Sequence, residues 1–217
     1  MKTIRSRGRL TLLVLSLAAA AALQACAPLA VGGAALTGAM VVTDRRSSGA
    51  QLDDQGIELR AESRLRDQMG SRARINVTSY NRRALLTGEV ANNRDKELAE
   101  AIVSKVDNVT GVQNELEVAN SPSFTERAED GLITGKVKAG LVDSRQVSAN
   151  AFKVVTDRGV VYLMGRVTQR EADIATQVAR TTKGVQRVVR VLEILTEEEL
   201  ARIGAKSDAA KSDAPKQ

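Results

Sequence analysis

Hydrophobic and polar residues follow one pattern that occurs twice along the chain. Residues 57–65 and 133–141 both carry apolar side chains at their first, fifth and ninth positions, the spacing of one helix face. Two short, largely apolar runs follow each helix around a tight polar turn, which is typical of a β-hairpin. The predicted hairpin strands are 75–80 with 84–90 in the first copy, and 152–157 with 161–167 in the second.

Each copy ends in a second amphipathic helix and one further strand. The helices are predicted at 94–106 and 170–180, and the strands at 114–118 and 187–191. The order of elements is αββαβ, so the fold class is α+β: two tandem small domains, each a three-stranded sheet packed with two helices. A domain of roughly 65–70 residues has a small core, and the two copies are therefore expected to pack against each other.

The first 25 residues have the zones of a secretory signal peptide. Four basic residues come first, and an apolar run from Leu10 to Leu23 follows. This run is shorter than the roughly 20 residues that a helix needs to cross a membrane, so cleavage is favoured over a retained span. The basic residues of this peptide are Lys2, Arg5, Arg7 and Arg9.

The signal peptide ends in Leu23-Gln24-Ala25-Cys26, which resembles the lipobox of bacterial lipoproteins. The alternative is a free or structural thiol, but this cysteine has no partner for a disulfide, since it is the chain's single one. Several acyl chains on Cys26 would give stable membrane anchoring. Ala27 resembles the outer-membrane sorting signal, so the expected location is the periplasmic face of the outer membrane.

Prolines divide the rest of the chain. Pro28, Pro122 and Pro215 fall outside the predicted elements, as expected because proline is excluded from helix interiors and central strands. The last residues contain a near-repeat of Ala-Lys-Ser-Asp-Ala, which predicts disorder. The predicted division is a signal peptide at 1–25, a lipidated terminus and tether at 26–52, domains at 53–120 and 128–195 with a linker at 121–127, and a disordered tail at 196–217.

Composition narrows the possible functions. The chain has no histidine, no tryptophan and one cysteine, which removes the usual general base, thiolate nucleophile and soft metal ligands. We therefore expect no catalytic residues, no metal, no cofactor and no enzymatic activity. The chain has 32 basic and 26 acidic residues, but four of the basic ones lie in the signal peptide, which leaves a net charge of only +2. So small an excess predicts no binding of nucleic acid.

The repeat resembles the BON domain. The resemblance rests on the αββαβ order, on Gly88 and Gly165 inside the second hairpin strands, and on the Gly-Val pairs before the last strands. These two glycines indicate a bulge or a close backbone approach. From Cys26 to Ile194 the chain is similar to dual BON-domain outer-membrane lipoproteins. That resemblance implies binding of anionic phospholipid by the second domain, with roles in outer-membrane integrity, cell division and outer-membrane protein assembly.

A helical wheel suggests where lipid would bind. In the second domain's first helix, the side opposite the core carries a stripe of small and apolar residues with lysines at its border, which suits insertion among anionic headgroups. At the corresponding positions of the first domain stand Gly56, Leu59, Ser63 and Arg66, a solvated face. The alternative is that the stripe packs against the first domain or the linker. The predicted phospholipid-binding residues are Leu132, Gly135, Lys136, Lys138, Ala139 and Val142.

A second functional hypothesis is a protein–protein adaptor for which lipid serves only as an anchor. Such an adaptor would regulate cell-wall hydrolysis at division or outer-membrane protein assembly. Its partners would be a cell-wall hydrolase activator or the outer-membrane protein assembly machinery.

Overall fold

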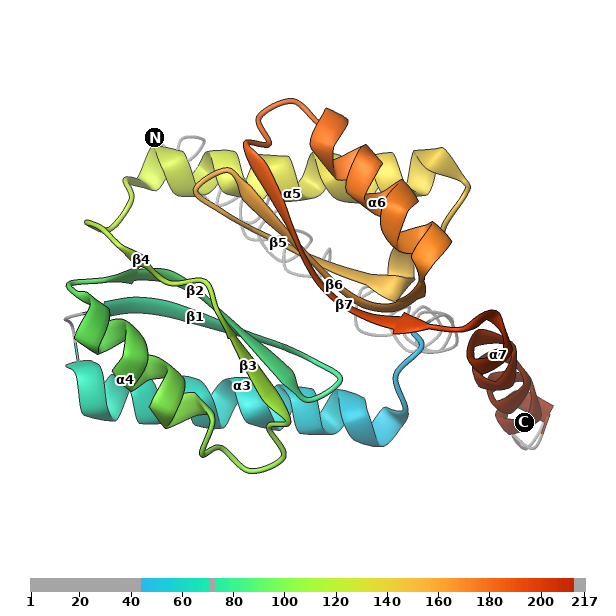
Figure 1. The fold of residues 1–217 in the computed structure, drawn as a ribbon, viewed down its shortest axis with the longest axis horizontal. Helices are drawn as coiled ribbons and strands as arrows, with labels where there is room; N and C mark the ends of the chain where they lie inside the picture. The colour runs from blue at the N-terminus through green and yellow to red at the C-terminus, as the bar shows by residue number, and fades with distance from the viewer. Residues whose placement is uncertain (1–43, 71–72, 213–217) are drawn as a thin grey trace, which may run out of the picture. The chain divides into compact units, whose positions relative to one another are not determined.

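The computed structural model describes residues 44–70 and 73–212, without the side chains of 206–212. The predicted signal peptide and Cys26 lie outside these residues. Within them the chain forms two copies of one αββαβ unit, here named repeat 1 (residues 48–118) and repeat 2 (residues 124–195), followed by one more helix (Figure 1). The predicted α+β fold class is confirmed.

Repeat 1 packs two helices on one face of a sheet (Figure 1). Its first two strands are antiparallel and meet at Asn81 and Arg82, which have φ angles of 50° and 67°. Positive φ at both central residues is the requirement of the hairpin turn that matches strand twist. The later strands pair in parallel with the second one. The elements are α3 (Ser48–Met69), β1 (Ala73–Tyr80), β2 (Arg83–Val90), α4 (Asn93–Val103), β3 (Gly111–Asn114) and β4 (Glu117–Val118).

Repeat 2 repeats this topology. Its hairpin turns at Arg158 and Gly159, again with positive φ, and its last strand runs parallel to the central one over nine residue pairs. Its two helices also lie on a single face of the sheet (Figure 1). The elements are α5 (Phe124–Ser144), a 3₁₀ turn (Ala149–Ala151), β5 (Phe152–Asp157), β6 (Val160–Thr168), α6 (Gln169–Thr181), β7 (Arg187–Leu195) and, after the repeat, α7 (Glu197–Ser212).

Each repeat has its own hydrophobic core, and a third cluster joins the two. The predicted core stripes of α3 and α5 are buried, as Ile57 and Val137 at 0 % exposure illustrate. Tyr80 and Leu85 of repeat 1 form the third cluster with Tyr162 and other residues of repeat 2. The expectation that two small domains pack against each other is therefore confirmed.

The segment before α3 contacts both repeats. Arg45 donates two hydrogen bonds of 2.6 and 2.7 Å to the carboxylate of Glu171 in α6. Arg46 donates to Asp54 at 2.8 Å and lies over the ring of Tyr80, 4.4 Å from its centroid. Two arginines placed in the predicted tether are thus part of the folded unit.

Both first helices begin earlier than predicted. α3 begins inside the predicted tether, and α5 begins inside the predicted linker. The physical reason is helix capping: the hydroxyls of Ser47 and Ser123 accept hydrogen bonds from backbone N–H groups of the first turn. The carboxylate of Glu126 accepts a hydrogen bond from the backbone N–H of Ser123, which completes a capping box.

The prediction of a disordered tail is wrong for residues 197–212, which form α7. Thr196 and Glu199 exchange the hydrogen bonds of a capping box at 2.8 and 3.2 Å. Glu197 and Glu198 add negative charge to the first turn, where the helix dipole favours it. The low-complexity composition had hidden this helix start.

The last strand of repeat 1 is interrupted, where the sequence predicted one strand at 114–118. The side chain of Asn114 donates to the carbonyl oxygen of Lys96 in α4 at 2.9 Å, and Leu116 is buried at 2 % exposure. Strand pairing stops at Asn114, where this side-chain bond is made, and resumes at Glu117, after the buried Leu116.

The two interior glycines serve a close backbone approach, as predicted. Gly88 has a φ of 117°, and a Cβ atom there would lie 2.0 Å from the carbonyl oxygen of Arg74. At Gly165 it would lie 2.4 Å from the carbonyl oxygen of Ala151. Only glycine fits these two positions without moving the neighbouring backbone.

Candidate functional site

Helix α5 presents one apolar face to solvent. Leu132 is 64 % exposed and Val142 is 61 % exposed, whereas Ile133 on the opposite side is 7 % exposed. The six residues that the sequence singled out on this helix are all exposed. In the part of the chain that the structure describes, this face is therefore covered neither by repeat 1 nor by the linker.

Phe124 extends this face by two turns. It is the first residue of α5 and is 80 % exposed. The sequence interpretation placed it in the linker and missed it, although the pattern Ser123-x-x-Glu126 marks a helix start at this position. We name the solvent-facing positions the α5 outer face: Phe124, Ala128, Gly131, Leu132, Gly135, Ala139 and Val142.

The equivalent helix of repeat 1 is less apolar on its outer side. Leu52 and Leu59, seven residues apart, are 69 % and 70 % exposed, so α3 is not as polar there as the sequence suggested. Beyond Leu59, however, the same side continues with Ser63 and Arg66, which are exposed and polar. The apolar surface of α3 thus ends halfway along the helix, while that of α5 runs its full length.

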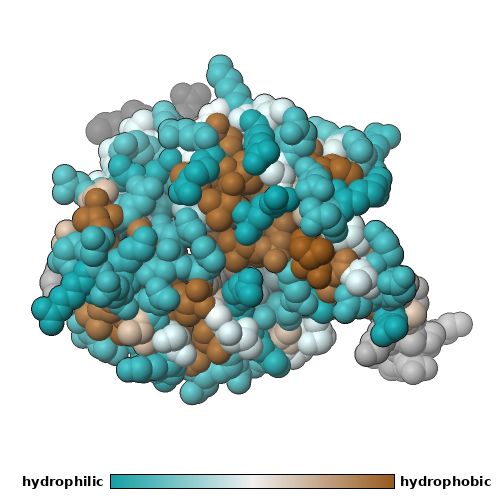
Figure 2. All heavy atoms as spheres, in the orientation of Figure 1, coloured by the Kyte–Doolittle hydropathy of each residue, from teal (hydrophilic) through white to brown (hydrophobic). Residues whose placement is uncertain are grey.

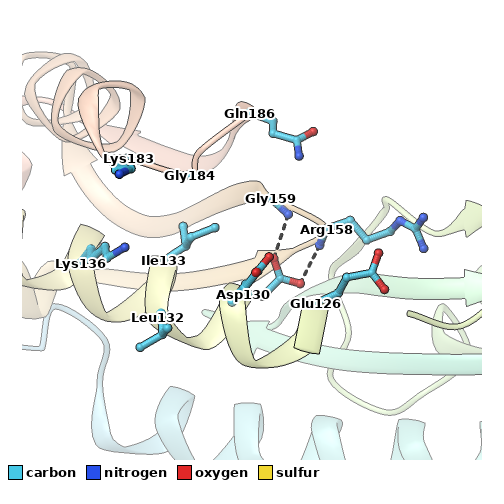
Figure 3. Close-up of a pocket in the computed structure, with 11 residues that line it drawn as sticks. Glu126, Asp130, Leu132, Ile133, Lys136, Arg158, Gly159, Lys183, Gly184 and Gln186 are labelled. Atoms are coloured by element: carbon cyan, nitrogen blue, oxygen red, sulfur yellow. Dashed lines mark hydrogen bonds between the residues drawn. The ribbon is translucent and has the colours of Figure 1, made fainter. Parts of the chain in front are cut away.

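A cavity of about 510 Å³ lies beside the first half of α5 (Figure 3). Asp130 lines it and accepts hydrogen bonds of 2.8 Å from the backbone N–H groups of Arg158 and Gly159. This contact ties α5 to the β5–β6 turn. Leu132 lines the same cavity and also belongs to the α5 outer face, so the two features are continuous.

Cationic side chains from two elements line this cavity. Lys136 comes from α5 and Lys183 from the loop between α6 and β7, and Figure 3 shows both at the same end. Arg158 at the other end pairs with Glu117 at 3.3 Å. Lys136 is predicted from the sequence but Lys183 is not, because only the fold brings that loop beside α5.

Other apolar surface lies along β7. On the face drawn in Figure 2, hydrophobic residues gather near the centre of the view, over this strand. Ile194 is 49 % exposed, while Val188 and Val189 are half-buried. Exposed Arg187, Arg190 and Glu193 interrupt this surface, so it is less uniform than the α5 outer face.

The described residues give no sign of metal chemistry or of a membrane span. Among them no three His, Cys, Asp or Glu side chains come together as metal ligands. None of the helices formed by those residues is long and apolar enough to cross a bilayer.

A tandem pair of αββαβ units, the second of which leaves an apolar helix face exposed, defines a small two-domain α+β protein. Comparison with known proteins identifies the class. The family model of the BON domain matches residues 53–120 and 129–196, so the chain belongs to the BON-domain family.

Two relatives match over most of the chain. The outer membrane lipoprotein DolP of Haemophilus influenzae is 36 % identical over 185 residues, which are 84 % of this chain and 95 % of the relative. The 21 kDa hemolysin of Actinobacillus pleuropneumoniae is 34 % identical over 151 residues, 69 % of this chain and 78 % of the relative. Neither name designates an enzyme.

A solved structure, the C-terminal domain of CdsD from the type III secretion system of Chlamydia trachomatis, is similar at 15 % identity. The match covers 64 % of this chain and 96 % of the solved chain, with a TM-score of 0.28.

Proposed function

We propose that the chain is a lipid-anchored protein of the outer membrane that binds anionic phospholipid through the α5 outer face. The observation that carries the proposal is this face itself: an apolar stripe along a whole helix, exposed to solvent and bordered by Lys136 and Lys138. An apolar helix face with cationic residues at its edge suits the boundary between headgroups and acyl chains. Its role is to hold repeat 2 on the membrane and so maintain outer-membrane integrity.

The proposed location rests on two further facts. The sequence around Cys26 resembles a lipobox, whose acylated cysteine would supply an anchor, and the relative from Haemophilus influenzae is named an outer membrane lipoprotein. Sorting by Ala27 would place the protein on the periplasmic face.

The contact energy expected from this face is modest. Complete burial of a phenylalanine, leucine or valine side chain contributes about 1.5–3 kcal/mol, and each lysine near an anionic surface about 1 kcal/mol. Because the side chains at an interface are only partly buried, the helix alone gives weak and reversible binding. Combined with the acyl chains, it orients repeat 2 against the membrane.

Vesicle co-sedimentation tests the proposal. The mature chain with Cys26→Ser, which lacks acyl chains, is mixed with vesicles of phosphatidylglycerol and phosphatidylcholine, or of phosphatidylcholine alone. Leu132→Glu is compared with the matched variant Leu59→Glu, because the two leucines are exposed to the same degree on equivalent helices. We expect the wild-type chain to sediment only with the vesicles that contain phosphatidylglycerol. Leu132→Glu should no longer sediment with them, whereas Leu59→Glu should sediment like the wild type.

Absence of binding by the folded wild-type chain would overturn the proposal. The adaptor hypothesis would then be pursued through crosslinking to an envelope partner, such as the outer-membrane protein assembly machinery or a cell-wall hydrolase activator. Equal loss of binding in both variants would show that α5 has no special part in the contact.

A further inference from the structure

The two repeats meet along a small apolar contact between their sheets, here named the seam. Each repeat also has a separate core of its own. The seam can therefore weaken or tighten while both repeats stay folded. Among the described residues, its buried side chains are Tyr80, Leu85, Val160, Tyr162, Met164 and Val191.

The two ends of the seam are built alike. At one end the hairpin turn of repeat 2 contacts the last strand of repeat 1, where the Nε atom of Arg158 lies 3.3 Å from a carboxylate oxygen of Glu117. At the other end the hairpin turn of repeat 1 contacts the last strand of repeat 2, where Asn81 donates to Glu193 at 2.7 Å. Equivalent positions at the two ends can therefore be compared directly.

The end at Asn81 holds a carboxylate with a matching cation. Glu193 accepts a second hydrogen bond from Arg166, its register partner on β6, at 3.0 Å. Tyr80, the last residue of β1, is uncharged, because burial raises the pKa of its phenol to about 12. One guanidinium from these strands thus faces one carboxylate.

At the opposite end the same positions carry two more carboxylates. Asp157, the last residue of β5, stands in place of Tyr80. Glu89 follows the interior glycine of its strand and stands in place of Arg166. Both carboxylates are buried, at 9 % and 2 % exposure. The exchange makes this end of the seam rich in negative charge.

One arginine serves both buried carboxylates. Arg74 donates to Glu89 through two nitrogen atoms, at 2.8 and 3.0 Å, and its Nη2 atom also donates to Asp157 at 3.2 Å. Arg158 is divided in the same way: its Nη1 atom lies 3.7 Å from Glu89, and its Nε atom lies close to Glu117. Two guanidiniums thus face three carboxylates.

The charges around this end do not remove the excess. Asp130 of α5 is a further carboxylate, since the backbone N–H groups that it accepts leave its negative charge in place. Tyr162 of β6 is neutral, because burial raises the pKa of its phenol. Arg187 of β7 lies 3.9 Å from Glu115, so this pair cancels. The other charged groups that line the cavity beside α5 also cancel, two against two: Glu126, Glu129, Lys136 and Lys183.

These surroundings favour the neutral form of Asp157. Burial raises the pKa of its carboxyl above the ordinary value, and the charges of Glu89 and Asp130 raise it further. Arg74 opposes them but is shared with Glu89, so the pKa stays raised. A carboxyl whose pKa is raised by folding stabilises the folded state below its unfolded pKa, and this contribution is lost as the pH rises through the folded pKa.

We propose that Asp157 makes the seam an acid-closed latch, in which the ionised carboxylate weakens the contact between the repeats near neutral pH and protonation strengthens it. After protonation the carboxyl can still accept the hydrogen bond from Arg74 through its carbonyl oxygen, while the excess of negative charge falls by one. Opening exposes apolar side chains of the seam, such as Leu85 and Tyr162. The latch does not depend on the lipid contact proposed above.

Asparagine at position 157 imitates the protonated carboxyl and tests the sign of the effect. In the mature chain carrying Cys26→Ser, we expect Asp157→Asn to raise the urea midpoint at about pH 7, although it removes one charge of an ion pair. The gain should shrink as the pH falls toward about 4, because the parent carboxyl then becomes protonated as well. Asp173→Asn is the matched control: this exposed carboxylate of α6 pairs with Arg190 outside the seam and should give no gain.

The reactivity of a buried thiol shows whether the seam itself opens. Leu85 and Leu86 are adjacent on β2 and both 0 % exposed, but Leu85 packs in the seam and Leu86 in the core of repeat 1. Leu85→Cys and Leu86→Cys are each reacted with dithiodipyridine, which remains active in acid, and the ratio of the two rates cancels the effect of pH on the thiol. We expect this ratio to fall several-fold from about pH 7 to about pH 5. With Asp157→Asn added, it should be low at both pH values.

Two results would overturn the latch. One is a ratio of rates that does not change with pH or that Asp157→Asn leaves unaltered. The other is a lower urea midpoint for Asp157→Asn at about pH 7, which would show that the ion pair with Arg74 outweighs the excess charge. If a cysteine variant fails to fold, the urea measurement decides by itself, because it needs no added cysteine.

Discussion

Asp54 and Asp130 make the same contact in the two repeats. Each carboxylate, on the first helix of its repeat, accepts hydrogen bonds from two successive backbone N–H groups at the hairpin turn, over distances of 2.7–2.8 Å. The two residues are 2 % and 8 % exposed. A buried carboxylate with these partners fixes the helix against the hairpin, and in repeat 2 it also forms one wall of the cavity.

Removing this carboxylate from repeat 2 is expected to destabilise the fold. In Asp130→Ala the N–H groups of Arg158 and Gly159 lose their acceptor, at a cost of about 2–3 kcal/mol. Urea unfolding followed by circular dichroism measures the change. The effect of Asp54→Ala should be larger, since Asp54 also accepts from Ser79 and Arg46. A midpoint of Asp130→Ala equal to that of the wild type would show that the contact contributes nothing.

The Arg45–Glu171 pair is expected to couple the segment before α3 to repeat 2. Both side chains are nearly buried, at 12 % and 10 % exposure, and their two hydrogen bonds are charge-assisted. A double-mutant cycle with Arg45→Ala and Glu171→Ala should give a coupling free energy of about 1.5–3 kcal/mol. Strictly additive effects of the two substitutions would contradict this account.

This pair also predicts a dependence of stability on pH. Burial alone would raise the pKa of Glu171, but hydrogen bonds from Arg45 and Thr168 outweigh it and hold the pKa below its ordinary value. A carboxyl whose pKa is lowered by folding stabilises the fold above its unfolded pKa, and this contribution is lost as the pH falls through the folded pKa. The difference in unfolding free energy between wild type and Glu171→Gln should therefore shrink as the pH falls below about 4.5. A difference that stays constant down to pH 3 would contradict the assignment.

A methyl group at Gly88 should not be tolerated. Its Cβ would meet the backbone of Arg74, and its φ is unfavourable for alanine, so Gly88→Ala should cost several kcal/mol or prevent folding. Gly131→Ala is the matched control: this glycine lies in α5 with nothing near its Cβ position. The control should stabilise the protein by about 0.5–1 kcal/mol, because alanine favours helix. Thermal unfolding compares the two, and a stable Gly88→Ala protein would disprove the packing argument.

Local patterns predicted most of the fold. The helical spacing around Ile57 and Ile133 and the polar hairpin turns are properties of neighbouring residues. The structure has the predicted hairpin strands and second helices within a few positions. The helix starts were missed where hydrogen-bonding caps, rather than hydrophobic period, set the boundary. Phe124 was therefore assigned to the linker, although the signal of Ser123 and Glu126 was present.

The site could be predicted only in part, for a physical reason. The α5 outer face belongs to one helix, so its spacing in the sequence reveals it. Lys183 lies 47 positions after Lys136, and no local pattern indicates that they share a cavity. Likewise, the partnership of Arg45 with Glu171 depends on how the two repeats pack.

The fluorescence of a single tryptophan on α5 tests most directly whether this face enters a membrane. The chain has no tryptophan, so Leu132→Trp and the matched Leu59→Trp each carry one reporter. On addition of phosphatidylglycerol vesicles, the account predicts that the emission of Leu132→Trp moves to shorter wavelength and is quenched by brominated acyl chains, while that of Leu59→Trp stays unchanged. Equal quenching at both positions, or none at position 132 while the protein still binds the vesicles, would contradict it.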